Sequence, residues 1–251
     1  MNPFPAPDVS VVIPAYREAS HIAAAVAEAL AFFDRIRASC EVIVVDDGSD
    51  DSTGAEAERA ASVDARVRLI SLDGHRGKGA AVRTGIRASR GARVLVIDAD
   101  RAIPLAEFPA FARALEEGAD LAVASKELGR RRGLVERRFL RTLMSRAFNL
   151  VVRALVVPGL SDTQAGFKLF RGDAARSLAG RCRLDGFTYD VELLALARLE
   201  GMKIVELPVH CRLTGGTNVR VMRDGVAMLA DLVRIRGRLA AEVRRRGGRD
   251  A

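Results

Sequence analysis

Short apolar runs alternate with longer amphipathic segments over the first two-thirds of this chain, and this alternation restricts the possible folds more than any other feature. The apolar runs predict strands at residues 9–13, 41–46, 67–72, 93–98 and 121–124, with another at 204–209. The amphipathic segments predict helices at 20–37, 79–90 and 107–117, and a capping box at Thr53 and Glu56 predicts the start of another. Such alternation is typical of an α/β fold, a Rossmann-like, open and mostly parallel sheet flanked by helices.

Length and composition fit one globular domain. With 251 residues, 49% of them hydrophobic, the chain can bury a full-sized core. Its longest apolar stretch, 150–160, is shorter than the roughly 20 residues that cross a bilayer, and residues 1–8 lack the order of a secretion signal, so we expect a cytoplasmic protein. Cys40, Cys182 and Cys211 are odd in number and widely spaced, which favours reduced thiols over disulfides or a metal site.

The positive charge is concentrated in two segments. The net charge is +8, and residues 126–153 hold nine basic and two acidic residues, while residues 234–251 hold seven and two. One region of the surface is therefore expected to meet an anionic partner: a phosphate-bearing substrate, an anionic membrane or a nucleic acid. The chain has no Trp and does not interleave aromatic with basic residues, which disfavours nucleic acid.

Two C-terminal amphipathic helices are predicted at 134–157 and 226–243, because apolar residues recur there at helical spacing among arginines. Two interpretations stay open for each: a core-facing helix with a solvated arginine face, or a helix that lies on an anionic membrane. Residues 237–251 are predicted to form a basic tail.

Polar and glycine-rich residues follow each of the first four predicted strands, at 14–18, 46–51, 73–79 and 98–100. In an open parallel sheet, ligands bind beyond the carboxyl ends of the strands, where the loops converge and helices begin. We therefore expect these four loops to share one rim and to form one site.

The aspartates of these loops suggest a metal and a diphosphate. Asp98 and Asp100 follow an apolar run, where their oxygens and those of a diphosphate could coordinate a hard divalent cation. The alternative for this pair, and for Asp46 and Asp47, is that the aspartates cap a turn. Lys78, between two glycines, offers a cation for phosphate. The chain contains neither Gly-x-x-x-x-Gly-Lys-Ser/Thr nor, in its first loop, Gly-x-Gly-x-x-Gly, which argues against phosphate-loop NTPases and dinucleotide dehydrogenases.

Six motifs, in this order, resemble those of family 2 glycosyltransferases of the A-type fold. They are VVIPAYRE at 11–18, VVDDGS at 44–49, RGKG at 76–79, DAD at 98–100, DTQAGFKLF at 162–170 and DVELL at 190–194. The first four are shared across that superfamily, whereas the fifth is similar to the polyprenyl (dolichyl) phosphate glucosyltransferases. The resemblance implies a catalytic domain at 1–236, with a nucleotide-sugar-binding part at about 8–125 and an acceptor-side part at about 126–236.

The resemblance implies roles for the matched residues. Asp98 and Asp100 would hold Mg²⁺ or Mn²⁺ on the diphosphate of a UDP- or GDP-hexose, Lys126 would face the acceptor phosphate, and Asp162 would be the base for a hydroxyl acceptor. The catalytic candidates are Asp98, Asp100, Asp162, Lys126 and Lys168. The substrate-binding candidates are Pro14, Tyr16, Glu18, Asp46, Asp47, Lys78, Gly79, Asp98, Ala99, Asp100, Gln164, Arg130 and Arg212.

The implied activity is metal-dependent, inverting transfer of a hexose to a polyprenyl phosphate by a protein that is cytoplasmic or peripheral on the inner face of an anionic membrane. Ala102 favours glucose, since mannosyl relatives often carry Gln at that position. Arg101, and Gly-Thr-Asn at 216–218 in place of a Gly-Ser-Lys turn, depart from the family pattern. The alternatives are the same fold with a soluble small-molecule, protein or glycan acceptor, a basic nucleic-acid-binding module, and a nucleotidyltransferase.

Overall fold

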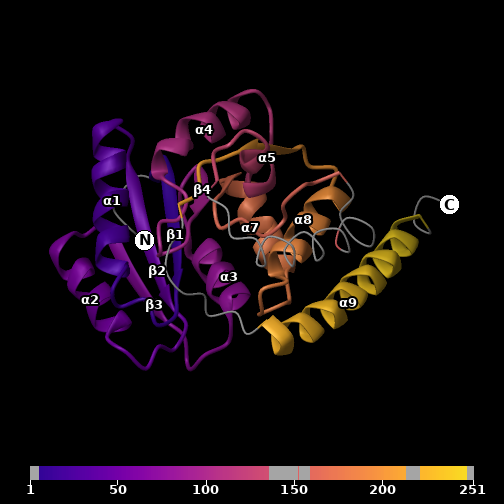
Figure 1. Ribbon diagram of the computed structural model, residues 1–251, viewed down its shortest axis with the longest axis horizontal. Coiled ribbons are helices and arrows are strands. Elements are labelled where there is room, and N and C mark those ends of the chain that lie inside the picture. The colour runs from indigo at the N-terminus through magenta and orange to yellow at the C-terminus, as the bar shows by residue number, and fades with distance from the viewer. Residues whose placement is uncertain (1–5, 136–151, 153–158, 213–220, 248–251) are drawn as a thin grey trace.

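The structure is a computed structural model that describes residues 6–135, 152, 159–212 and 221–247. Its centre is one seven-stranded sheet in the order β3-β2-β1-β4-β6-β5-β7. Figure 1 shows the part of the sheet that contains β1 to β4. The strands are β1 (Val9–Ala15), β2 (Cys40–Asp46), β3 (Val67–Ser71), β4 (Arg93–Val96), β5 (Leu121–Ser125), β6 (Lys168–Arg171) and β7 (Ile204–Pro208). Neighbouring strands are parallel, except that β6 runs antiparallel to both β4 and β5. The predicted Rossmann-like, mostly parallel sheet is confirmed.

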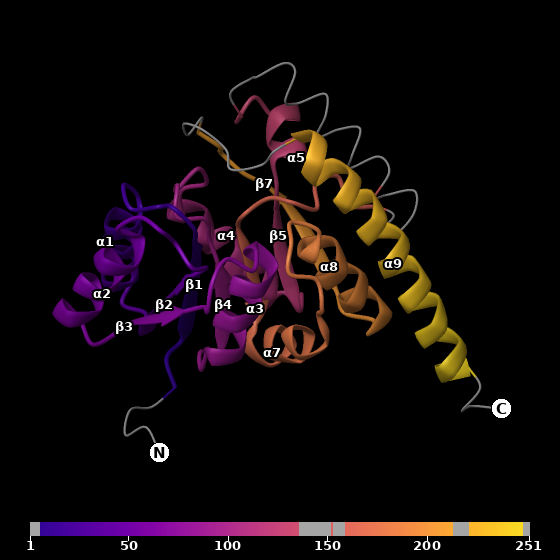
Figure 2. The same ribbon diagram turned by 90° about the horizontal axis from the view of Figure 1, so that it is seen from below.

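Helices cover both faces of the sheet. They are α1 (Ile22–Arg35), α2 (Thr53–Val63), α3 (Lys78–Ala88), α4 (Phe108–Glu116), α5 (Lys126–Arg131), α7 (Gly172–Arg181), α8 (Tyr189–Leu199) and α9 (Val221–Gly247). Buried side chains of α1, α2 and α4 pack on one face, and those of α3, α7 and α8 on the other. Helix α9 packs on α8, and its C-terminal end extends away from the body of the protein (Figure 2).

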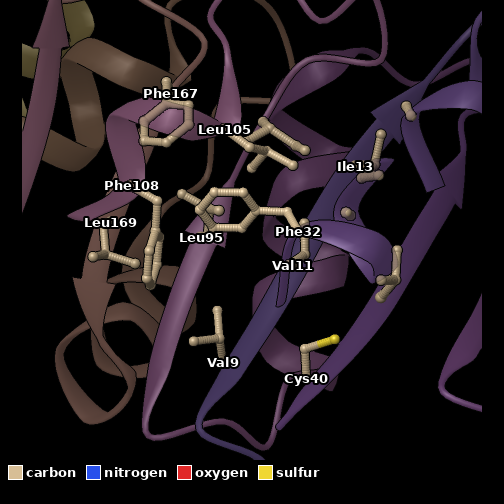
Figure 3. Packing of buried hydrophobic residues seen from close by; sticks show 14 of the residues in the cluster. Val9, Val11, Ile13, Phe32, Cys40, Leu95, Leu105, Phe108, Phe167 and Leu169 are labelled. Atoms are coloured by element: carbon tan, nitrogen blue, oxygen red, sulfur yellow. The ribbon is translucent and has the colours of Figure 1, made fainter. Parts of the chain in front are cut away.

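Phenylalanines fill the core beneath α1 and α4. Phe32 and Phe33 of α1 meet Phe108 of α4 edge to face, with ring centroids 5.9 and 5.0 Å apart. They share one cluster with Val11 of β1 and Leu95 of β4 (Figure 3). Burying each such side chain contributes about 1.5–3 kcal/mol. This core therefore holds β1 and β4 side by side, at the point where the strand order reverses.

The predicted strands and the predicted helices at 20–37, 79–90 and 107–117 end within two residues of the observed elements, whereas α9 is longer than the predicted 226–243 helix by five residues at its start and four at its end. The capping box is wrong, because Thr53 is the first residue of α2 rather than its cap. The Thr53 amide and hydroxyl both donate to Asp51 Oδ1, over 3.0 and 2.5 Å, so the aspartate satisfies this helix start. Strand β6 and helices α5, α7 and α8 were not predicted as elements.

The C-terminal predictions are covered only in part. Of the helix predicted at 134–157, only residues 134, 135 and 152 are described, and the turn at 216–218 and residues 248–251 lie outside the described residues. Helix α9 contains the predicted 226–243 helix and is amphipathic: Leu232 and Ile235 are buried, whereas Val233 is exposed. In the described part of the chain, no helix combines the length and apolar character that a membrane span requires. The three cysteines are free thiols.

Candidate active site

The four predicted loops meet at the carboxyl ends of β1 to β4, as expected. The Asp47 amide donates to the Ala15 carbonyl over 2.9 Å, which joins the loops after β1 and β2. The Lys78 ammonium lies 2.6 Å from Asp98 Oδ1, which joins the loop after β3 to the loop after β4. The rim lies where the strand order reverses between β1 and β4, the usual ligand position in an open α/β sheet.

Asp46 and Asp47 hold this rim together. Asp47 is 2% exposed, and its carboxylate accepts the amides of Arg76 and Gly77, each over 2.8 Å. Asp46 Oδ1 accepts the amide and hydroxyl of Ser49 over 3.1 and 2.5 Å. The turn interpretation therefore describes Asp46, whereas the carboxylate of Asp47 positions the loop at 73–79.

An aromatic pair forms the outer end of the rim. The rings of Tyr16 and His75 stack with centroids 3.9 Å apart and an interplanar angle of 20°. The imidazole is oriented by Asp47, whose Oδ2 lies 2.8 Å from His75 Nδ1. Stacked aromatic faces suit a nucleobase. His75 was not among the candidate residues, although the glycine-rich loop that contains it was predicted to form part of the site.

The carboxylates at the centre of the rim are Asp98, Asp100 and Glu18. Burial alone would raise the pKa of Asp98, but the positive charges of Lys78, Lys126 and Lys168 outweigh it and lower that pKa below its ordinary value. Burial raises the pKa of Glu18, and the negative charges of Asp100 and Asp98 add to that rise. Asp98 is therefore held ionised, and these three carboxylates sense one another's charge.

The loop after Asp98 adopts a tight turn that directs Arg101 away from the pair. Arg101 has φ 55°, and its guanidinium lies 3.3 Å from Glu28 of α1. The Ala102 amide donates to Asp100 Oδ1 over 3.0 Å. Arg101, which departs from the family pattern, thus pairs with α1 in this structure.

Two glycines allow the backbone to come unusually close to the site. A Cβ added at Gly166 would lie 1.7 Å from Asp98 Oδ2, and one at Gly79 would lie 2.5 Å from Tyr189 Cβ. Both positions therefore require glycine. Two other candidates, Pro14 and Ala99, are buried and offer no polar side-chain group to a ligand.

The acceptor-side candidates gather around the start of α5. Asp162 is 3% exposed; its Oδ2 accepts the Lys126 amide over 3.0 Å and its Oδ1 accepts the Gln164 amide over 3.1 Å. The Gln164 side chain donates to the Phe187 carbonyl over 3.4 Å. Arg130 pairs with Glu127 of its own helix. Asp162 is thus tied to the backbone on both oxygens.

Lys168 and Arg212 differ in their exposure. Lys168 is 2% exposed, and its ammonium lies 2.6 Å from Asp190 Oδ1, so its charge is paired inside the protein. Arg212 is exposed, and its amide donates to the Ala102 carbonyl over 2.9 Å. Asp190 was not a candidate, although the DVELL motif contains it.

A small pocket, partly open to solvent, lies between Asp98 and the acceptor-side residue Lys126. Its lining residues are Ile97, Asp98, Ala102, Ile103, Lys126, Gly166, Phe167 and Cys211. Asp98 and Lys126 thus share one cavity. Cys211, which the sequence predicts only to be a reduced thiol, is half-buried there.

The donor groups fit a hard divalent cation that also binds a diphosphate. Among the described residues, no group of three or more His, Cys, Asp or Glu side chains is arranged to hold a metal by itself. Magnesium is commonly bound by one or two carboxylates together with substrate phosphates. Asp98 and Asp100 supply such carboxylates, so these two residues would hold the ion.

The fold, with its mostly parallel sheet covered by helices, is that of glycosyltransferases of the A-type fold. The chain belongs to glycosyl transferase family 2, whose family model matches residues 10–178. It is 34% identical to the dolichyl-phosphate beta-glucosyltransferases of Dictyostelium discoideum and Homo sapiens. The alignments cover 94% and 92% of this chain and 76% of each relative. The protein is therefore a glycosyltransferase.

Solved structures agree on the fold. Glucosyl-3-phosphoglycerate synthase from Mycobacterium tuberculosis, in complex with Mn²⁺, UDP-glucose and phosphoglyceric acid, matches with a TM-score of 0.67 at 22% identity, over 92% of this chain and 80% of that one. Mannosyl-3-phosphoglycerate synthase from Rubrobacter xylanophilus matches with a TM-score of 0.64 at 21% identity, over 96% and 75%. At this level of identity the likeness establishes the A-type fold.

Proposed function

We propose that this protein transfers glucose from UDP-glucose to a polyprenyl phosphate, with inversion at the anomeric carbon and with Mg²⁺ or Mn²⁺ bound. The observation that carries the proposal is the pocket shared by Asp98 and Lys126, which brings an anion-binding cation beside the metal pair. The names of the relatives support glucose and a dolichyl phosphate acceptor. The Mn²⁺ and UDP-glucose complex of the structural neighbour supports the donor and the metal.

On the donor side, this chain's residues would bind and orient UDP-glucose. The stacked rings of Tyr16 and His75 offer a face for the base, and Lys78 offers a cation to the diphosphate. Asp98, held ionised by the surrounding lysines, and Asp100 would hold the metal. The bound metal would supply a Lewis acid that stabilises the charge of departing UDP.

On the acceptor side, Lys126 would bind the phosphate and orient one of its oxygens toward the anomeric carbon. A phosphate monoester is already ionised near neutral pH, since its second pKa is about 6, so it needs no general base. Asp162, the candidate base, accepts backbone amides on both oxygens. These contacts support a phosphate acceptor over a hydroxyl acceptor, because only the latter would require Asp162 to take a proton.

We propose further that α9 docks the protein on the cytoplasmic face of an anionic membrane. Leu232 and Ile235 pack inward, whereas Val233 is 68% exposed and the Arg234 side chain 74% exposed. Exposed arginines beside apolar side chains favour binding to anionic lipid. The protein should sediment with vesicles that contain 30% phosphatidylglycerol and not with pure phosphatidylcholine, and a variant with Arg234→Gln and Arg236→Gln should sediment less. Equal sedimentation of the variant would contradict docking through α9.

The activity test is a product assay with radiolabelled UDP-glucose, Mn²⁺ and detergent-dispersed polyprenyl phosphate. We expect a lipid-linked glucose product and stoichiometric UDP, and a loss of at least ~10²-fold in rate for Asp98→Asn, because the metal site acts where charge develops. Asp34→Asn is the matched control, since Asp34 pairs with Arg66 near the end of α1, away from the rim. It should keep the activity.

The outcomes separate the acceptors. Product on 3-phosphoglycerate or another soluble phosphate, and none on the lipid, would replace the lipid acceptor by a soluble one. Product from a GDP-sugar instead of UDP-glucose would overturn the donor. If UDP is released equally with and without every acceptor, transfer itself is refuted.

A further inference from the structure

A buried ion pair lies beneath the rim. The Lys168 ammonium is 2.6 Å from Asp190 Oδ1, and the two side chains are 2% and 4% exposed. The same ammonium donates to the Ala165 carbonyl over 2.6 Å. Burying two charges costs several kcal/mol per ion, so such a pair often gives no more stability than apolar residues of the same size. Stability alone therefore does not explain why the pair is present.

The sheet places Lys168 beside the end of β4, the strand that leads to Asp98. Lys168 opens β6 and lies opposite Val96 of β4, two residues before Asp98. Because β6 is antiparallel to β4, the start of one strand and the end of the other share the rim.

Lys168 also fixes the backbone that touches Asp98. It binds the carbonyl of Ala165, and the next residue, Gly166, lies so close to Asp98 that a Cβ there would fall 1.7 Å from Oδ2. A shift of the segment 165–167 would therefore push the carboxylate or release it. The hydrogen bond from Lys168 holds that segment in place.

Asp190 connects the pair to the other side of Asp98. It lies in the first turn of α8, next to Tyr189, whose side chain packs against Gly79 at the start of α3. Lys78, the residue before Gly79, lies 2.6 Å from Asp98 Oδ1. The start of α8 therefore contacts the backbone beside the second lysine that flanks Asp98.

We propose that Lys168 and Asp190 are positioning residues, which act through the segment 165–167 to keep the Asp98 carboxylate where it holds the metal of the nucleotide complex. The inference rests on the proposed function in that it takes Asp98 as a metal ligand. It assigns the pair no contact with the acceptor, which the burial of Lys168 excludes in this structure. The alternative is a purely structural pair.

The test measures binding as well as activity. The double variant Lys168→Met with Asp190→Asn removes both charges and keeps similar shapes, so it leaves no unpaired buried ion. Binding of Mn²⁺ in the presence of UDP is followed by electron paramagnetic resonance, and folding by thermal unfolding. We expect a folded variant whose Mn²⁺ affinity in the presence of UDP is at least tenfold weaker. A folded variant with unchanged affinity overturns the proposal.

Asp190→Glu provides a second arm, because it keeps both charges and displaces the carboxylate by one methylene. A several-fold loss of Mn²⁺ affinity in the presence of UDP is expected there too, and unchanged affinity also counts against positioning. The unaltered protein is measured first: if it binds no Mn²⁺ with UDP, the proposed function fails, whereas binding by the unaltered protein with no change in the variants refutes only the positioning role.

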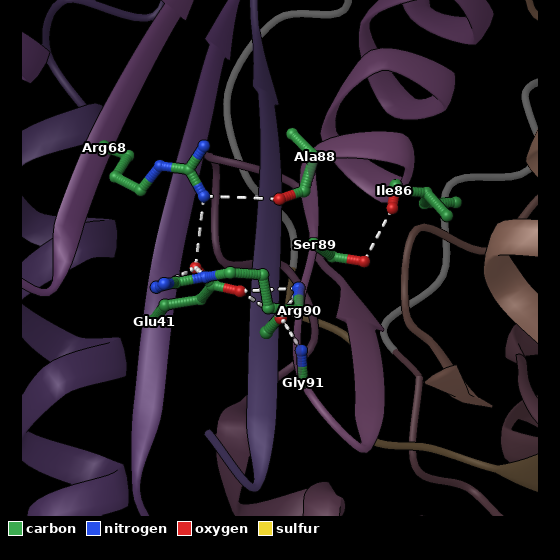
Figure 4. A network of polar contacts seen from close by, with 8 residues as sticks. Glu41, Arg68, Ile86, Ala88, Ser89, Arg90 and Gly91 are labelled. Carbon is green, nitrogen blue, oxygen red and sulfur yellow. Dashed lines mark hydrogen bonds and ion pairs between the residues drawn. The ribbon is translucent and has the colours of Figure 1, made fainter. Parts of the chain in front are cut away.

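Glu41→Gln is the matched control, since Glu41 is another buried carboxylate with cationic partners. It lies near the amino end of β2, whereas the rim lies at the carboxyl ends of the strands. It is 2% exposed and accepts hydrogen bonds from Ser10, Arg90 and Arg68 (Figure 4). Its replacement should lower the melting temperature and leave Mn²⁺ affinity in the presence of UDP unchanged. A loss of affinity equal to that of the Lys168 double variant would show that general destabilisation explains both.

Discussion

Gly166→Ala tests the geometry of the site most directly. The added methyl group would lie 1.7 Å from Asp98 Oδ2 and 2.2 Å from its Cγ, whereas real Cβ contacts under 3.0 Å are essentially never seen. The carboxylate or the segment 165–167 must therefore move by about 1.3 Å, the difference between these two contact distances. A displacement of about 1 Å at a reacting centre can cost ~10²-fold in rate.

We therefore expect kcat/KM of Gly166→Ala to fall by at least ~10²-fold, which corresponds to about 2.7 kcal/mol of lost transition-state stabilisation. The assay is initial-rate UDP release with UDP-glucose, Mn²⁺ and polyprenyl phosphate, together with Mn²⁺ binding in the presence of UDP. Because the displaced group is a half-buried carboxylate at the rim rather than core packing, the protein should remain folded.

Gly180→Ala is the control for the same chemical change. Gly180 lies within α7 and a Cβ there would meet nothing within 4 Å. Alanine in a helix is favoured over glycine by about 0.5–1 kcal/mol, so this variant should keep full activity and melt at the same or a higher temperature. Wild-type kcat/KM in Gly166→Ala would refute the reasoning, since the observed position of Asp98 would then not be the one used in the reaction.

Three further predictions concern other parts of the molecule. Lys78→Met removes the ammonium that lies 2.6 Å from Asp98 Oδ1. Mn²⁺ binding without nucleotide should therefore strengthen several-fold, while the KM for UDP-glucose rises. Weaker Mn²⁺ binding would contradict competition between Mn²⁺ and the Lys78 ammonium. Glu41→Gln should lower the free energy of unfolding at pH 7 by about 1–3 kcal/mol. Burial raises the pKa of Glu41, but hydrogen bonds from Ser10 and Arg90 outweigh burial and hold this pKa below its usual 4.5. The difference in unfolding free energy between the variant and the unaltered protein is therefore fully present above pH 4.5 and should shrink as the pH falls further. Urea unfolding at pH 7 and pH 4 measures this difference. Cys211, half-buried in the pocket, should react with a thiol reagent before the buried cysteines, Cys40 and Cys182, because a reagent can reach it more easily. Burial raises the pKa of all three thiols, that of Cys182 to about 12. Peptide mapping after brief labelling checks the order.

The sheet and its rim could be predicted from the sequence, because strand periodicity and the position of ligands at strand ends are local or topological rules. Helix α8 could not be predicted from an amphipathic pattern, since all but the last two of its residues are buried, Asp190 and Glu192 included. A helix buried on every side shows no polar face. Strand β6 has only four residues and lies inside a motif that was interpreted chemically.

The partners of the polar residues were the part that sequence could not supply. Asp47 was assigned to the nucleotide, yet its oxygens accept amides from residues 76 and 77, thirty positions away. Lys168 was assigned to catalysis, yet it pairs with Asp190. Such partners depend on which faces of distant elements meet, and this is fixed by packing rather than by local pattern.

The register of β6 explains why the buried pair and the metal carboxylate belong together. Residues opposite each other on antiparallel strands point to the same face, and Val96, the partner of Lys168, packs in the core of α3 and α8. Lys168 therefore meets α8, which carries Asp190. A shift of β6 by one residue would turn the ammonium toward the phenylalanines beneath α4 and bury it without a carboxylate. The cost of that unpaired charge opposes the shift, so the ion pair specifies the register that also sets Gly166 against Asp98.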